Sequence, residues 1–231
     1  MLFQKYFKVI PTVLILILVS SALVAYVEAA DWSISSDIRS ASISAHANQS
    51  FGGGPGNVME SVLDVPALFP EKLETGVRDI KENEREASGI VSMEMNDGEI
   101  RILGRISAKD SNPNDFIAPI ATVKGIVTFD LKVVLSGERK NLRGKLRLSG
   151  KGAPSLVGEG GQKPPANVLV KVWLNEQLLL KSSDFLLGKD KAFPQPLQHG
   201  DILTILFQGD FSLLSTGEAD IISTLSYSFE P

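Results

Sequence analysis

The chain of 231 residues contains no cysteine and only two histidines. The absence of cysteine excludes disulfide bonds, thiolate metal sites, a cysteine nucleophile and a lipid-bearing N-terminal cysteine. His46 and His199 lie far apart in the sequence, which argues against a site built from several histidines. A basic excess is also missing: the net charge of −4 argues against a general nucleic-acid binder. We therefore expect no cofactor and no nucleic-acid partner.

What the chain does contain is enough apolar material for a core. Hydrophobic residues make up 43% of the sequence and charged residues 22%, so the composition is not that of a disordered protein. The length suits one ordinary domain or one larger all-β domain, and a core of that size can be stable without disulfide bonds.

An apolar segment dominates the N-terminus. Lys5 and Lys8 precede residues 9–27, which carry no charge, and Ala29 offers a small residue for cleavage. A positive start followed by an apolar run is typical of an export signal. The run is longer than most signal cores and long enough to cross a bilayer, so residues 1–29 are either a cleaved signal peptide or a retained anchor. Both alternatives predict an extracellular or cell-surface protein, exported by the general secretory route.

The rest of the sequence alternates between apolar and polar residues, which is the pattern of half-buried strands. Asn96-Asp97-Gly98 joins two such runs, and Asp-Gly is a strong signal for a tight hairpin. The pattern predicts a mainly all-β fold, an antiparallel β-sandwich that is immunoglobulin-like or jelly-roll-like. The predicted strands are 38–47, 90–95, 99–106, 122–135, 142–148, 167–174, 177–182, 201–208 and 219–229.

Residues 58–86 interrupt this alternation. Apolar residues recur there at helical spacing, and Pro66 and Pro70 divide the segment into two parts. We therefore expect one or two short helices, the second highly charged. The predicted organisation is an export segment (1–29), an N-terminal strand with a Gly/Pro hinge (30–57), and a β-sandwich (58–231) with a charged helical insertion at 58–86.

Residues 31–50 form a Ser/Ala-rich strand ahead of the hinge. Such a terminal strand can lie in its own sheet, or it can leave to pair with the sheet edge of a neighbouring molecule. The second alternative predicts assembly through the apolar positions of the strand. These candidate assembly residues are Trp32, Ile34, Ile38, Ala41, Ile43 and Ala45.

Charge is unevenly spread. Residues 132–151 read as a basic hairpin, and residues 71–86 are rich in acids. The basic residues form either a solvated sheet face or a docking surface for an anionic glycan, lipid headgroups or an acidic partner, which a second copy could supply. The candidate basic face comprises Lys132, Arg143, Lys145 and Arg147.

Two further segments carry ligand or modification signals. Residues 110–115 alternate oxygen-bearing side chains as a calcium loop does, with Asp110, Asn112, Asn114 and Asp115 as candidate ligands. The loop lacks the glycine and the glutamate that a calcium loop places at its sixth and twelfth positions, and such residues also form ordinary turns. Asn48 begins the one glycosylation sequon, Asn48-Gln49-Ser50.

Signals for catalysis are few. The sequence has no nucleophile-elbow motif, and Lys163 is followed by Pro164 where a phosphate-binding loop needs Ser or Thr. We therefore expect a protein that is not an enzyme. A hydrolase would need carboxylates that converge in a pocket. Trp32 and Trp173 either stack on sugars or pack in the fold.

An export signal followed at once by a strand of short side chains, in a cysteine-free β-sandwich, resembles the camelysin/TasA-like secreted filament subunits of bacteria and archaea. The resemblance covers the plan of the chain from Met1 to Pro231, and the charged segment 58–86 departs from it. It implies a structural subunit that polymerises into extracellular filaments by donating N-terminal strands, with no catalytic residues. The alternative is an anchored or secreted binding module for glycan or another envelope component, with membrane contact only through residues 9–27.

Overall fold

The computed structural model describes residues 32–48, 58–65, 72–81, 85–96, 98–110, 120–136, 141–151, 168–213 and 217–231. These residues lie almost entirely in strands, in the order β1 (Trp32–Asn48), β2 (Val58–Val65), β3 (Lys72–Lys81), β4 (Arg85–Asn96), β5 (Glu99–Asp110), β6 (Ile120–Leu135), β7 (Arg143–Lys151), β8 (Val168–Leu174), β9 (Gln177–Lys181), β10 (Asp190–Ala192), β11 (Ile202–Leu213) and β12 (Gly217–Glu230). A short 3₁₀ helix, η1 (Ser182–Asp184), follows β9.

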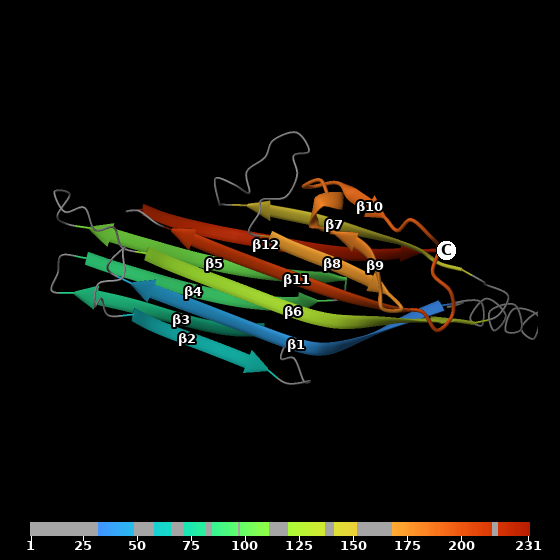
Figure 1. The fold of residues 1–231 in the computed structure, drawn as a ribbon, viewed down its shortest axis with the longest axis horizontal. Helices are drawn as coiled ribbons and strands as arrows, with labels where there is room; N and C mark the ends of the chain where they lie inside the picture. Colours follow the sequence, from blue (N-terminus) through green and yellow to red (C-terminus); the bar gives the residue numbers. More distant parts are fainter. Residues whose placement is uncertain are drawn as a thin grey trace, which may run out of the picture.

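The strands form two antiparallel sheets packed as a sandwich (Figure 1). Sheet A has the order β2-β1-β6-β11-β8-β9, and sheet B has the order β10-β7-β12-β5-β4-β3. The chain changes sheet repeatedly, for example between β2 and β3 and between β5 and β6. The predicted all-β antiparallel sandwich is thus confirmed at this level.

Local sequence explains the tight hairpins. The Asp-Gly prediction is confirmed: β4 and β5 pair from Asn96 and Glu99 onward, and Gly98 takes the positive φ of 77° that this turn requires. The β8–β9 turn is built in the same way, with positive φ at both Asn175 and Glu176. The β4–β5 pairing stays in register from the turn outward, whereas the β8–β9 register shifts between Val172 and Trp173.

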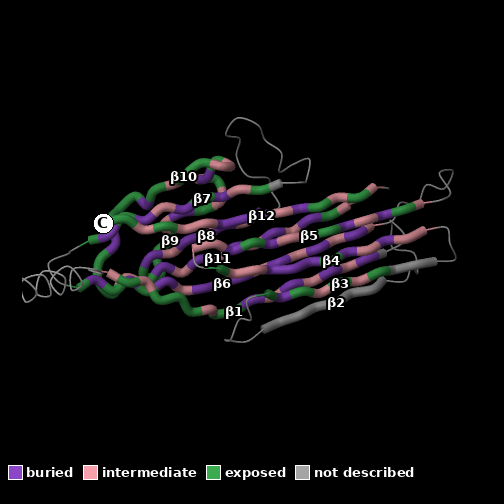
Figure 2. Tube along the Cα trace, turned by 180° about the vertical axis from the view of Figure 1, so that it is seen from behind, coloured by how far each residue is buried: buried purple, intermediate pink, exposed green. Residues whose placement is uncertain are grey.

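The core lies between the two sheets and follows from the period of two. Along β5, β6 and β11 buried side chains alternate with partly exposed ones (Figure 2). Large apolar residues from both sheets meet there, and full burial of each contributes about 1.5–3 kcal/mol. The largest fully buried side chains include Phe129, Phe185, Phe207, Phe211, Ile43 and Met93.

The prediction of helices within residues 58–86 is wrong. Residues 58–65 are strand β2, paired with β1, and residues 72–81 are strand β3, paired with β4. Leu73 and Val77 are four positions apart, so they share a face in a helix and equally in a strand. In β3, Leu73 is buried and Arg78 is exposed. Pairing along the sheet edges satisfies backbone groups that the ends of a short helix would leave open.

The export segment, residues 1–29, lies outside the described residues, as does the whole Gly/Pro hinge at 51–57. Among the described residues, no helix has the length and hydropathy needed to cross a membrane. Export therefore stays a prediction from the sequence.

Candidate functional site

Strand β1 lies within sheet A and has two unlike parts. It pairs with β6 from Trp32 to Asn48, but β2 pairs only with residues 41–48 (Figure 1). Within the described chain, residues 32–38 therefore have a ladder on one side only. We call residues 32–38 the open half of β1 and residues 41–48 the covered half.

A β-bulge separates the two halves. The register with β6 shifts between Ile38 and Ser40, so Arg39 is the extra residue. Because of this shift, even-numbered residues of the open half and odd-numbered residues of the covered half oppose buried residues of β6: Ile38 opposes Phe129 and Ala41 opposes Val127. Arg39 donates from Nε to Asp130 Oδ2 at 2.7 Å, which fixes the bulge to the neighbouring strand.

The two halves differ sharply in burial. Three candidate assembly residues of the covered half are in the core, with Ala41 4%, Ile43 0% and Ala45 1% exposed. The three candidates of the open half, Trp32, Ile34 and Ile38, are only half-buried against that core. In β1 as it stands, only the open half offers apolar surface to another molecule.

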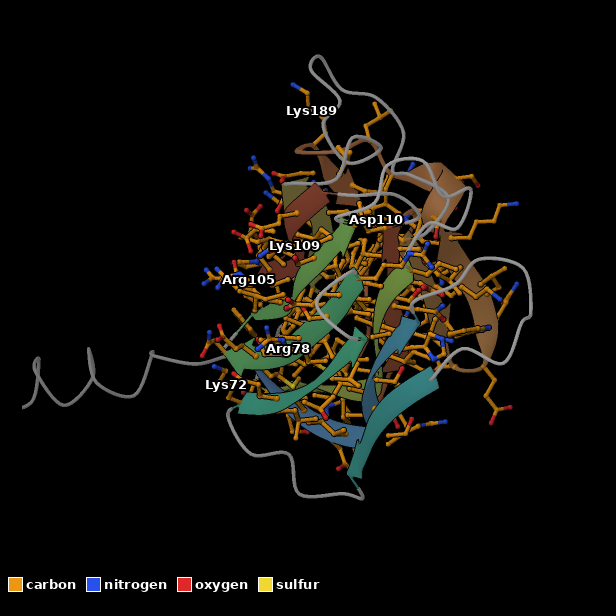
Figure 3. The ribbon with its side chains drawn as sticks, turned by 90° about the vertical axis from the view of Figure 1, so that its left-hand side faces the viewer. Lys72, Arg78, Arg105, Lys109, Asp110 and Lys189 are labelled. Carbon is orange, nitrogen blue, oxygen red and sulfur yellow. The ribbon has the colours of Figure 1, made fainter. Side chains whose placement is uncertain are left out.

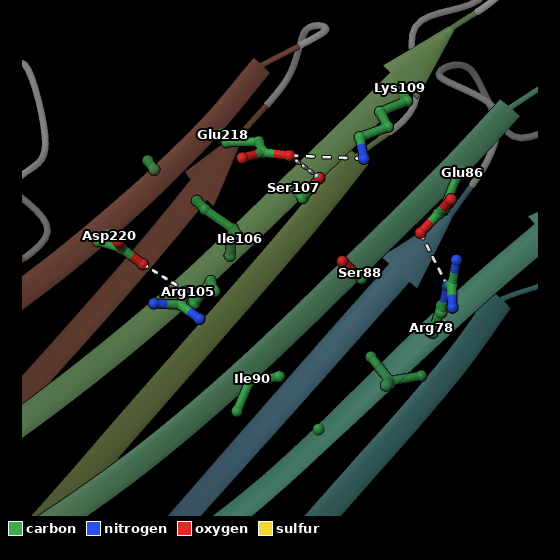
Figure 4. Close-up of a pocket in the computed structure, with 13 residues that line it drawn as sticks. Arg78, Glu86, Ser88, Ile90, Arg105, Ile106, Ser107, Lys109, Glu218 and Asp220 are labelled. Carbon is green, nitrogen blue, oxygen red and sulfur yellow. Dashed lines mark hydrogen bonds and ion pairs between the residues drawn. The ribbon is translucent and has the colours of Figure 1, made fainter.

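A second surface lies on the outer face of sheet B. A hollow of about 840 Å³ crosses β3, β4, β5 and β12, and Lys72, Arg78, Arg105 and Lys109 all point outward on this face (Figures 3 and 4). Ser88 and Ser107 face each other on its floor, beside Ile90, which is 47% exposed. Small floor residues between long charged ones give the hollow its depth.

Ion pairs border the hollow. Arg78 Nε lies 2.8 Å from Glu86 Oε1, Arg105 Nε lies 2.6 Å from Asp220 Oδ1, and Lys109 Nζ lies 3.5 Å from Glu218 Oε1 (Figure 4). The hydrogen bond from Arg78 lowers the pKa of Glu86, and the hydrogen bond to Asp220 raises the pKa of Arg105. The carboxylates here face cations, so the rim is charge-balanced and suited to binding more than to proton transfer.

The predicted basic face is divided by the fold. Residues 132–151 do not form a hairpin, because β6 belongs to sheet A and β7 to sheet B. Lys132 is therefore on a different sheet from Arg143, Lys145 and Arg147. Lys145 forms an ion pair with Glu230, and Arg147 lies 4.0 Å from Asp190. This pairing removes much of the positive field that the sequence alone suggested.

The calcium candidates fall at the border of the described chain. Asp110 ends β5 and faces Arg85, with Arg85 Nε 3.5 Å from Asp110 Oδ2 and both side chains 9% exposed. Asn112, Asn114 and Asp115 lie outside the described residues. Among the residues that are described, no group of three His, Asp or Glu is placed to hold a metal ion.

The remaining candidates are dispersed. Asn48 is the last residue of β1, and its side chain lies outside the description. Trp173 is half-exposed and has the opposite parity to the buried residues of β8. His46 pairs across from Thr122 near the start of β6, whereas His199 accepts a hydrogen bond from the Leu135 amide at its end. The two histidines therefore belong to opposite ends of the sheet.

Sequence reasoning missed the hollow, because its strands come from distant segments and one of them, β3, lies in the segment predicted to be helical. The available signal was the row of charged and small polar residues that share one parity in 105–109, namely Arg105, Ser107 and Lys109. Comparisons of the chain with protein-family models, with curated proteins and with solved structures find no match. Function is therefore inferred from the geometry of these two surfaces.

Proposed function

We propose that this chain is an exported, non-catalytic structural subunit of the cell surface that assembles through strand pairing at the open half of β1. The observation that carries the proposal is the one-sided ladder of residues 32–38. Backbone N–H and C=O groups at such an edge can pair with another strand and build a larger sheet.

The apolar face of the open half supports the same role. Trp32, Ile34 and Ile38 point to the core side but remain half-exposed. An added strand would extend sheet A and cover this row. Burial of apolar surface contributes about 25 cal/mol per Å², which adds to the backbone hydrogen bonds of the new ladder.

Addition of a strand to β1 accounts for these features better than donation of β1 itself. To leave its sheet, β1 would break its ladder with β6 and expose Ala41, Ile43, Ala45 and Ala47, all at most 4% exposed. That cost is a large part of the total stability of an ordinary domain, which is about 5–15 kcal/mol. The assembly mode implied by the resemblance is therefore modified: β1 stays in place and its edge is used.

The location follows from the N-terminus. A positively charged start and the uncharged residues 9–27 predict export, and a domain without cysteine relies on its core and ladders outside the cell. A strand edge 32–38 close after the export segment would lie near the membrane if that segment is retained.

Sedimentation of the exported product of the full chain tests the proposal, together with electron microscopy of native cell-surface material labelled by an antibody. We expect concentration-dependent association in solution and labelled multimers or filaments on the surface. A product that stays monomeric at high concentration, with labelling only of isolated particles, would contradict it.

The hollow on sheet B favours a second candidate function, binding of a neutral glycan. Each of three cations on its rim forms an ion pair with a carboxylate. Because these charges compensate one another, the rim does not favour an ionic ligand. Ser88, Ser107 and the ion pairs offer donors and acceptors that polyhydroxyl ligands can use. An array of cell-envelope glycans, probed with the wild type and with Arg105→Ala, tests this function. Binding that Arg105→Ala removes supports it, whereas equal binding or none contradicts it.

A further inference from the structure

The open half of β1 is a defined pairing unit of seven residues. It begins at Trp32 and ends at Ile38. The Arg39 bulge then interrupts the ladder with β6, and the pairing with β2 begins at Ala41. Seven residues of strand span about 23 Å. A partner strand of this length can pair here without meeting β2, which begins to pair at Ala41.

The core side of this unit is open at its centre. Ser36 has the parity of the core-facing residues and opposes the fully buried Leu131, yet Ser36 itself is exposed. Ile34 and Ile38, on either side of it, are only half-buried. The space beside the open half is therefore bounded by apolar side chains on the core side and by exposed Ser33, Ser35 and Asp37 on the solvent side.

The sequence of this unit is complementary to itself. When two copies of residues 32–38 run antiparallel about Ser35, Trp32 of each copy faces Ile38 of the other and Ile34 faces Ser36. On the solvent side, Ser33 faces Asp37 and Ser35 faces Ser35. Apolar residues thus meet on the core side, and like charges do not meet directly, which is what stabilises a cross-strand pair.

We propose that the partner of the open half is the open half of a second copy, paired antiparallel about a two-fold axis at Ser35. Sheet A of one molecule then continues into sheet A of the next. The inference rests on the proposed function and specifies its partner and register. A contact of this kind is isologous and produces a dimer, which a second contact elsewhere would have to link into a filament.

A single introduced cysteine can test this register by disulfide cross-linking, because the natural chain contains no cysteine. In the proposed dimer the two Ser35 Cα atoms are directly opposite, about 4.5–5.5 Å apart, within the range of a disulfide bond. The two Ser33 Cα atoms are about 13 Å apart along the strand direction, beyond that range. Ser33→Cys is thus a matched control: it is exposed, on the same face and two residues away.

The experiment oxidises the exported products of Ser35→Cys, Ser33→Cys and Asp37→Cys full-length chains under mild conditions. We expect a disulfide-linked dimer for Ser35→Cys, at least tenfold above that of Ser33→Cys or Asp37→Cys alone. A mixture of Ser33→Cys and Asp37→Cys should cross-link to each other, because those positions face one another. Each reduced variant should keep the denaturation midpoint of the wild type, since all three positions are exposed.

Two failures are distinguishable. If the wild type associates in sedimentation but Ser35→Cys cross-links no better than Ser33→Cys, the proposed register and partner are wrong and the assembly function stands. If the wild type is monomeric throughout and none of the variants cross-links, the assembly function itself is wrong.

Discussion

The covered and open halves of β1 are one continuous strand in two different surroundings. The covered half has a strand on each side and places Ala41, Ile43, Ala45 and Ala47 in the core. Among the described strands the open half has one neighbour, β6, and its Trp32, Ile34 and Ile38 are half-buried. Three of the four core residues of the covered half are alanines, in a place where two sheets and two neighbouring strands close around β1. Larger apolar residues occur where part of that enclosure is missing. The difference separates residues that hold the fold from residues available to a partner.

The largest expected effect comes from truncating one isoleucine in each half. Ile43→Ala should lower the free energy of unfolding by about 2–5 kcal/mol, because a fully buried side chain leaves a cavity. Ile34→Ala should cost clearly less, since Ile34 is already half-exposed. Urea denaturation of both variants, at a concentration where the protein is monomeric, measures the contrast. Equal losses would mean that the two halves are not enclosed differently.

A second substitution tests how tightly the covered half is packed. Gly125 pairs with Ile43, and a Cβ added there would lie 2.9 Å from Ile102 Cγ2 and 3.2 Å from Met93 Cε. Gly125→Ala should therefore destabilise the fold by about 1–3 kcal/mol through overpacking. Ser36→Ala in the open half is the control, and we expect a change within about 0.5 kcal/mol. An unchanged denaturation midpoint for Gly125→Ala would show that the sheets have room to separate there.

A smaller effect concerns association and has a predicted sign. In the proposed dimer Ser33 faces Asp37 of the other copy, whereas within its own chain it faces Val134. Ser33→Lys should strengthen the dimer and Ser33→Glu should weaken it, each by about 0.2–1 kcal/mol for each of the two cross-strand pairs. Sedimentation equilibrium at low and moderate salt measures both variants. Shifts in the same direction for Lys and Glu would contradict an electrostatic pairing.

The smallest effect is on the outer face of the strands that pack over the covered half. Arg78 lowers the pKa of Glu86, so the pair stabilises the fold at pH values above the ordinary pKa of a glutamate, and this stabilisation is lost as the pH falls through the lowered value. Arg78→Gln should therefore have a lower free energy of unfolding than the wild type near neutral pH. This difference in stability should fade in acid. An NMR titration of Glu86 and denaturation at several pH values test this. A difference in stability that grows in acid would contradict a stabilising pair between Arg78 and ionised Glu86.

Much of the fold was predictable because period-two alternation and turn chemistry act locally. The strand predicted at 122–135 is β6 almost residue for residue, and the Asp-Gly hairpin lies where expected. The prediction of helices within 58–86 failed for a physical reason. Apolar residues three and four positions apart fit a helix, but the available partners β1 and β4 favour strands at 58–65 and 72–81. The spacing of residues along the chain does not show which strands will be available as partners.

The candidate sites were less predictable, since they depend on which strands become neighbours. Lys132 and Arg143 are close in sequence yet belong to different sheets, while the hollow joins Arg78 to Arg105 and Asp220. For β1, the sequence identified the strand and left open whether it stays in its sheet. The pairing of Ile34 with Val133 lies beyond sequence reasoning, because it joins segments about a hundred positions apart.

The pairing of β1 with β2 and β6 also sets the order in which the two halves of β1 can form ladders during synthesis. The covered half can pair with β2 as soon as Val65 has emerged, because Ala41 pairs with Val65 and the two strands are joined by a short connection. Among the strands that the structure describes, the open half pairs only with β6, so this pairing waits until residues 129–135 have been made: Ile38 pairs with Phe129 and Trp32 with Leu135. While the chain grows, residues 32–38 are thus the last part of β1 to find their place. Until β6 has been made, residues 32–38 lack the strand that holds them in the sheet, so the timing of β6 helps to decide whether β1 pairs first within its own molecule.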